Sequence, residues 1–107
     1  MSNTILIVED EETLRLALTQ GLAAKGFHVI TAEKGNAAVS MIKNSIIDLV
    51  LLDLQLPDAS GIEILSEIKN INIKIPVIIM TGHGDIKTSV EAMKKGAYDY
   101  ILKPFEL

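Results

Sequence analysis

The sequence contains no cysteine among its 107 residues. This absence excludes disulfide frameworks, thiolate metal sites and thiol nucleophiles. No apolar run approaches the roughly 20 residues that a membrane span needs, and the N-terminus lacks the basic, apolar and small-residue pattern of a signal peptide. We therefore expect a soluble, cytoplasmic protein that makes no membrane contact.

Positive charge is also scarce, with 10 Lys and Arg residues against 14 Asp and Glu residues and a formal net charge of −4. This balance argues against direct binding of nucleic acid, so any role at DNA would need another domain. The hydrophobic fraction of 49% and the charged fraction of 22% are typical of one globular domain. We expect that single domain to cover residues 1–107.

Short apolar segments alternate with segments of helical periodicity, which implies a parallel sheet with right-handed crossovers. Gly26 and Gly96 are stop signals for the first and fourth helices. The predicted strands cover residues 4–8, 27–31, 49–52, 76–80 and 98–102. The apolar helix stripes are Leu14, Leu18 and Leu22; Ala38, Met41 and Ile42; Ile64, Leu65, Ile68 and Ile71; and Ile86, Val90 and Met93, with Met41 and Met93 interpreted as core or interface residues.

The distribution of polar residues predicts the order of the strands. Segments 4–8, 49–52 and 76–80 are apolar on both faces and therefore belong in the middle of the sheet. Segments 27–31 and 98–102 carry polar residues, which suits the two edges. The order 2-1-3-4-5 satisfies this pattern and defines a doubly wound α/β fold.

Asp53 follows the apolar run Leu49–Leu52 directly. A carboxylate at the exit of a buried strand costs several kcal/mol unless it has partners. We therefore expect Asp53 at the carboxyl edge of the sheet, where open α/β sheets bind their ligands.

Four predicted strand ends bring polar side chains to that same edge. Three carboxylates in one place would repel one another unless a cation lies among them, and hard oxygen ligands suit Mg²⁺. A lysine and a hydroxyl opposite them would hold phosphoryl oxygens, and carboxylates are known phosphoryl acceptors. The pattern predicts that Asp53 accepts a phosphoryl group. The residues are Glu9, Asp10, Asp53, Thr81 and Lys103.

Simpler explanations exist for several acidic and polar residues taken alone, although not for Asp53, because aspartate is a poor strand residue and no cap is evident there. Acids at a helix N-terminus favour the helix dipole, which for Glu11 and Glu12 is the preferred explanation by roughly three to one. Thr81 alone would be a cap and Lys103 alone a solvated residue. Only the coincidence of all these residues at one predicted edge favours a site.

Four segments of the sequence resemble the receiver domain of two-component response regulators: ILIVEDEE, DLVLLDLQLPDASG, PVIIMTGHG and KKGAYDYILKPF. The resemblance covers nearly the whole chain. The stretch TGHGDIKTSVEAMKKGAYDY is most similar to receivers attached to sigma-54-dependent transcription activators.

The resemblance implies that Asp53 takes a phosphoryl group from the phosphohistidine of a sensor histidine kinase. Asp10 and Asp53 would bind Mg²⁺ directly and Glu9 through water, with the backbone carbonyl of Gln55 completing the protein ligands. The domain would then be a signalling device that promotes its own phosphorylation and dephosphorylation, not an enzyme. It would control an output domain, expected to act in transcription.

The resemblance also implies a switch. Thr81 and Lys103 would contact the phosphoryl oxygens, and the movement of Thr81 would let Tyr100 turn inward. Without the resemblance, Tyr100 is simply a half-buried aromatic residue on an edge strand. A cis peptide between Lys103 and Pro104 is expected from the family.

Two departures from the family pattern stand out. Glu9 replaces the commoner aspartate, which weakens Mg²⁺ binding if the contact is direct. The sequence stops at Leu107, before the expected fifth helix, and this predicts an uncovered apolar face on the fourth and fifth strands. We expect such a chain either to form a homodimer or to be less stable than a receiver with that helix.

Three alternatives remain open. A phosphatase with an aspartate nucleophile combines similar residues, but its nucleophile follows the first strand and a second aspartate stands two residues later, where this chain has Gln55. A flavodoxin-like nucleotide binder needs a phosphate-cradling first loop, and the run EDEE would repel phosphate. A receiver-like module that works without phosphorylation would not need the full set of site residues.

Overall fold

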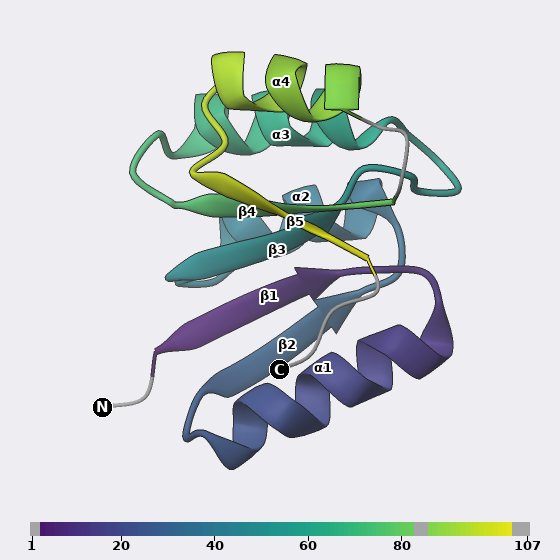
Figure 1. Ribbon diagram of the computed structural model, residues 1–107. Coiled ribbons are helices and arrows are strands. Elements are labelled where there is room, and N and C mark those ends of the chain that lie inside the picture. Colours follow the sequence, from purple (N-terminus) through teal and green to yellow (C-terminus); the bar gives the residue numbers. More distant parts are fainter. Residues whose placement is uncertain (1–2, 83–85, 104–107) are drawn as a thin grey trace.

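The computed structural model describes residues 3–82 and 86–103. Within these residues, five parallel strands form one sheet in the order β2-β1-β3-β4-β5, which confirms the predicted order and the doubly wound α/β fold (Figure 1). The strands are β1 (Thr4–Val8), β2 (His28–Ala32), β3 (Leu49–Asp53), β4 (Val77–Thr81) and β5 (Asp99–Leu102). The helices are α1 (Glu12–Ala24), α2 (Gly35–Asn44), α3 (Gly61–Ile71) and α4 (Ile86–Lys94).

The sheet separates two apolar cores. In β1, Leu6 and Val8 belong to the core beneath α2, α3 and α4, whereas Ile5 and Ile7 belong to the core beneath α1. All four side chains are at most 3% exposed, as expected for a strand that is covered on both faces. Figure 1 shows α1 on one side of the sheet and α3 and α4 on the other. This burial explains why β1, β3 and β4 lie in the middle.

Helix ends follow the sequence signals closely. Gly26 and Gly96 take positive φ angles of 96° and 108°, which favour glycine, and they follow α1 and α4 as predicted. The inward stripes of α1 and α2 are also confirmed, with Leu18, Ala38 and Ile42 buried.

Two stripe predictions are wrong in part. Ile71, at the end of α3, is 38% exposed, because it lies past the last turn that packs on the sheet. In α4 the apolar stripe faces outward: Val90 is 49% exposed, whereas Ser89 and Ala92 are buried. Small side chains let α4 approach the rest of the domain closely, and Met93, at 39% exposed, is therefore not a core residue.

Several expectations lie outside the described residues. The proposed cis peptide involves Pro104, and the expected fifth helix would follow Leu107; neither belongs to the residues that the structure describes. Among the described helices, none is long and apolar enough to cross a membrane.

Candidate functional site

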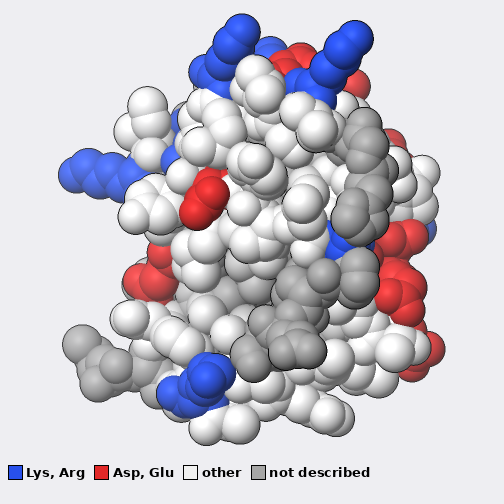
Figure 2. Space-filling view, in the orientation of Figure 1, with Lys and Arg blue, Asp and Glu red and all other residues white. Residues whose placement is uncertain are grey.

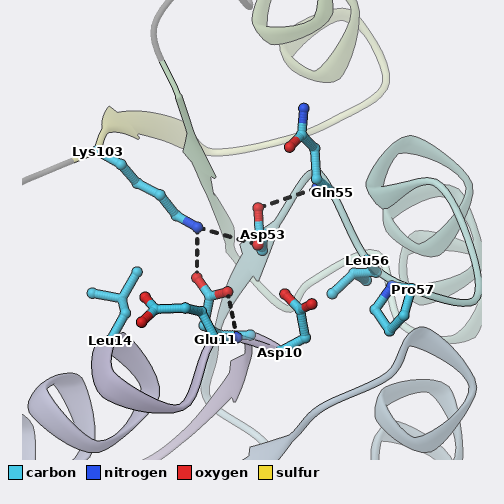
Figure 3. A pocket seen from close by; sticks show the side chains of 9 residues that line it. Asp10, Glu11, Leu14, Asp53, Gln55, Leu56, Pro57 and Lys103 are labelled. Atoms are coloured by element: carbon cyan, nitrogen blue, oxygen red, sulfur yellow. Dashed lines mark hydrogen bonds and ion pairs between the residues drawn. The ribbon is translucent and has the colours of Figure 1, made fainter.

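The carboxyl edge of the sheet carries the predicted site residues. Glu9 and Asp10 follow β1, Asp53 ends β3, and Lys103 follows β5. A cleft of about 710 Å³ opens at this edge (Figure 3). Its lining residues are Glu9, Asp10, Glu11, Leu14, Asp53, Gln55, Leu56, Pro57 and Lys103.

Lys103 joins two buried carboxylates. Its Nζ lies 2.6 Å from Glu9 Oε1 and 3.1 Å from Asp53 Oδ2 (Figure 3). The side chains of Glu9 and Asp53 are only 1% and 8% exposed. Backbone N–H groups bind their other oxygens: Gln55 N donates to Asp53 Oδ1 at 3.1 Å, and Glu11 N donates to Glu9 Oε2 at 3.2 Å. These contacts offset the cost of burying the two charges.

Three carboxylates at the edge could hold a cation together. Oxygen atoms of Glu9, Asp10 and Asp53 lie within 4.8 Å of one another. One lysine neutralises only one of these three negative charges, so a divalent cation would relieve the remaining repulsion. A set of carboxylate oxygens is the ligand chemistry of a hard cation such as Mg²⁺. The residues present therefore fit the predicted metal.

The charge state of Glu9 reflects its burial. Burial is the main cause that raises the pKa of this carboxyl from 4.5 to about 7; the hydrogen bond from Lys103 offsets part of the rise, and the neighbouring Asp53 adds to it. For the Lys103 ammonium, burial acts to lower the pKa, but the hydrogen bond to Glu9 and the charges of Asp53 and Glu9 outweigh it and raise that pKa. The site therefore favours a bound cation over unpaired negative charge.

Thr81 and Tyr100 do not line the cleft. Thr81 ends β4, is 1% exposed, and its hydroxyl donates to the carbonyl of Gly82 at 3.4 Å. Tyr100 is 44% exposed on the edge strand β5, opposite Ile79. The structure thus brings Glu9, Asp10, Asp53 and Lys103 together. The carbonyl of Thr81 accepts a hydrogen bond from the N–H of Lys103 at 2.7 Å, whereas the Tyr100 side chain is exposed.

Gln55 lies beside the candidate metal ligands, and the role of its carbonyl as a ligand stays a prediction. The residue lines the cleft two positions after Asp53, and its side chain points away from the carboxylates (Figure 3). Its backbone is held by a bridge to Ser60 and by the N–H contact to Asp53. Only its backbone therefore faces the candidate metal ligands.

Sequence reasoning missed part of the site. Glu11 is the N-cap residue of α1 and also lines the cleft. An interaction with the helix dipole therefore explains its place at the start of the helix but not its place in the cleft. Leu14 also lines the cleft, although its helical spacing indicated only a core residue. Nothing in the sequence distinguishes these two roles, because a residue near a helix N-terminus can face the core and the sheet edge at once.

Asp58 is a further residue whose role the sequence did not indicate. Its Oδ2 accepts a hydrogen bond from the N–H of Asn36 at 3.0 Å and its Oδ1 accepts one from Gly35 at 2.8 Å, and these two bonds lower the pKa of its carboxyl. The residue that precedes α2, Lys34, has no acceptor in its side chain. Asp58 therefore caps α2 from the loop that follows Asp53 and Gln55.

The strand order reverses between β1 and β3, which is where open sheets of this kind bind their ligands. Glu9, Asp10 and Asp53 lie at this point, so the fold and the site define a doubly wound α/β domain with an acidic, cation-fitting site. The chain belongs to the response regulator receiver domain family, which matches residues 5–107. The predicted family is confirmed.

Individual relatives agree with this assignment. The chain is 42% identical over 103 residues to the transcriptional regulatory protein FixJ of Rhizobium meliloti, covering 96% of this chain and 50% of FixJ. It is 39% identical over 105 residues to the regulatory protein AtoC of Escherichia coli, covering 98% of this chain and 23% of AtoC. The chain thus spans between about a quarter and half of the length of these relatives. Both relatives are regulatory proteins by name, which agrees with the resemblance to receivers of transcription activators.

A solved structure with the same fold is a response regulator protein from Burkholderia pseudomallei with a phosphorylated aspartic acid, a calcium ion and citrate. It aligns with a TM-score of 0.91 and 26% sequence identity, covering 98% of this chain and 62% of that one.

Proposed function

We propose that this chain is the phosphoacceptor receiver of a two-component system, in which Asp53 takes a phosphoryl group from the phosphohistidine of a sensor kinase. The observation that carries the proposal is the Asp53 carboxylate beside the Lys103 ammonium, 3.1 Å apart at the edge of an acidic cleft. A carboxylate oxygen of Asp53 would form the new P–O bond while the P–N bond breaks. The imidazole of the kinase leaves with the electron pair of that bond.

Mg²⁺ fits the oxygen donors of this site. Asp10 and Asp53 would bind it directly, Glu9 through water and Gln55 through its backbone carbonyl. When bound, Mg²⁺ supplies positive charge that reduces repulsion between the carboxylates and the incoming phosphoryl oxygens. Lys103 contributes a charge that is already beside Asp53. Lys103 alone leaves the carboxylate cluster with a net negative charge, and a bound Mg²⁺ would neutralise what remains.

Phosphorylation would be reported through Thr81 and Tyr100. Among the described residues, the Thr81 hydroxyl makes only a long contact of 3.4 Å to the neighbouring carbonyl, so a phosphoryl oxygen offers it a better partner. Its rotation would favour the state in which Tyr100 turns inward, which is a shift of population between two states. The surface of α4 and β5 would then change and reach an output domain in the parent protein.

The partners follow from the same proposal. The kinase and an output domain acting in transcription are the macromolecular partners, with a homodimer as a further assembly and the cytoplasm as the location. The receiver itself makes no direct contact with DNA, consistent with its net charge of −4. Asp53 itself becomes phosphorylated in each transfer, so the domain is a signalling acceptor and not an enzyme with a separate substrate.

Intact-mass measurement tests this function. The chain is incubated with Mg²⁺ and acetyl phosphate, and we expect a gain of one phosphoryl group that a chelator prevents. Asp53→Asn should abolish the gain, because the amide is a poor nucleophile. Asp99→Asn, at an exposed aspartate that begins β5, is the matched control and should retain it.

Two results contradict the proposal: no adduct on the folded wild-type chain, or an adduct that persists on Asp53→Asn. The first result would favour a receiver-like module that acts without phosphorylation. Continuous release of phosphate from many donor molecules per chain, without a trapped adduct, would favour the phosphatase alternative.

A further inference from the structure

Arg15 lies in the first turn of α1, beside the site but outside the lining of its cleft. Its Nη1 donates to the backbone carbonyls of Glu9 at 3.2 Å and Asp10 at 3.3 Å. Its Nη2 lies 3.2 Å from Glu33 Oε1, in the segment that follows β2. The Arg15 side chain is only 13% exposed. One guanidinium therefore joins α1 to the connections that follow β1 and β2.

The position of the Asp10 carboxylate depends on the backbone more than the positions of the Glu9 and Asp53 carboxylates do. Glu9 and Asp53 are each held by Lys103 and by a backbone N–H group. For the Asp10 carboxylate, the described part of the chain provides no hydrogen bond or ion pair, and Figure 3 draws no dashed line to it. Its place in the cluster must therefore follow from the peptide groups on either side of its Cα.

Arg15 binds both of those peptide groups. The carbonyl of Glu9 belongs to the peptide before the Asp10 Cα, and the carbonyl of Asp10 belongs to the peptide after it. We infer that Arg15 is a positioning residue for the cation site, which holds this backbone so that the Asp10 oxygens stay near those of Glu9 and Asp53. The inference rests on the proposed function, because it assigns a role toward the divalent cation that the three carboxylates would bind.

The chemistry of the side chain supports this role. A guanidinium is planar and presents several N–H donors, so it can bind two carbonyls and a carboxylate at once. A lysine in the same place would bring the charge but could not reproduce that arrangement of donors. Geometry, and not charge alone, is therefore the contribution of Arg15.

Charge and geometry predict opposite effects on metal binding. A positive charge close to three carboxylates opposes the binding of a cation, so removing that charge alone would tighten the binding of Mg²⁺. Loss of a residue that orients a metal ligand weakens binding by about 10-fold or more. The direction of the change therefore separates a positioning role from a simple electrostatic one.

The experiment measures the Mg²⁺ dissociation constant from the thermal midpoint of the 107-residue chain as MgCl₂ is added. We expect Arg15→Met to raise this constant by about 10-fold. Arg15→Lys keeps the opposing charge but not the arrangement of donors, so it should raise the constant as well. Glu33→Gln leaves the carbonyl contacts in place and should stay close to wild type, because the Glu33 side chain is 67% exposed and an ion pair with an exposed partner contributes little.

Stability in chelator, measured on the same variants, is the reference that shows whether each one folds. A folded Arg15→Met chain whose Mg²⁺ constant is unchanged or lower overturns the inference. If Arg15→Met does not fold, a wild-type constant for Arg15→Lys overturns it instead. If the wild-type chain shows no response to Mg²⁺, the metal site of the proposed function is overturned, and the inference with it. If the wild-type chain and both Arg15 variants respond equally to Mg²⁺, only the inference is overturned.

Discussion

At the residue scale, Glu9 is a fully buried carboxyl that shares one lysine with Asp53. Burial is the main cause that raises its pKa from 4.5 in the unfolded chain to about 7. A group whose pKa is higher in the folded state contributes stability that is complete below its unfolded pKa. That contribution is lost as the pH rises through the folded pKa. In the absence of metal, the domain should therefore lose stability between about pH 4.5 and pH 7.

This loss can be measured as the free energy of unfolding in urea with chelator present. A shift from 4.5 to about 7 corresponds to about 3 kcal/mol. Glu9→Gln should remove most of this pH dependence, because an amide does not ionise. Glu12→Gln, at the exposed start of α1, is the control and should keep the wild-type slope. Equal slopes in wild type and Glu9→Gln would show that burial of Glu9 does not control the titration.

At the element scale, the start of α3 packs against the end of β3. A Cβ atom on Gly61 would meet the Cα of Leu54 and would lie 2.7 Å from the carbonyl oxygen of Asp53. The N–H of Gly61 also donates to the Leu54 carbonyl at 2.9 Å. Glycine at this position therefore lets the helix lie directly against the backbone that carries the proposed phosphoacceptor.

Gly61→Ala should lower the free energy of unfolding by about 1–3 kcal/mol, because a backbone contact cannot move aside as a flexible side chain can. It should also slow phosphorylation of Asp53 by displacing the end of β3. Gly82→Ala is the matched control for stability, since its Cβ would meet nothing within 4 Å. Denaturant unfolding of both variants checks the prediction, which fails if the two lose equal stability.

At the scale of the whole molecule, α4 and β5 expose an apolar surface. We define this α4–β5 surface by its exposed side chains, which are Ile86, Val90, Met93, Tyr98, Tyr100 and Leu102. In the upper middle of the view in Figure 2, most side chains of the described residues are neither acidic nor basic, although one acidic side chain lies among them. Exposed apolar side chains on neighbouring elements favour association, which agrees with the proposed homodimer.

Sedimentation of the chain over a range of concentrations tests this association. Val90→Glu should raise the dimer dissociation constant by at least about 10-fold, because a charge would lose its water at the interface. Leu16→Glu is a matched control, since Leu16 on α1 and Val90 on α4 are both 49% exposed. A monomer at all concentrations, or equal effects of the two substitutions, would exclude this surface as the interface.

The order of the strands and the residues of the site could be predicted because both depend on local pattern. Apolar residues on both faces identify a central strand, and parallel strands end at one edge. The sequence pattern therefore predicts that Glu9, Asp10, Asp53 and Lys103 lie together at one edge of the sheet. The roles of Thr81 and Tyr100 remain predictions, because they concern a change between two states and the structure describes one.

Local patterns in the sequence predict the fold, the edge at which the carboxylates meet and the ends of the helices at Gly26 and Gly96. The pairing of the charges depends on long-range packing, because Lys103 and Glu9 are 94 positions apart and no local pattern encodes their 2.6 Å contact. Tertiary packing also turned the apolar stripe of α4 outward, since the small residues Ser89 and Ala92 allow the closer approach. Tertiary packing also placed the Arg15 guanidinium against the backbone carbonyls of Glu9 and Asp10, because the contacts of a long side chain depend on the fold and not on the local sequence.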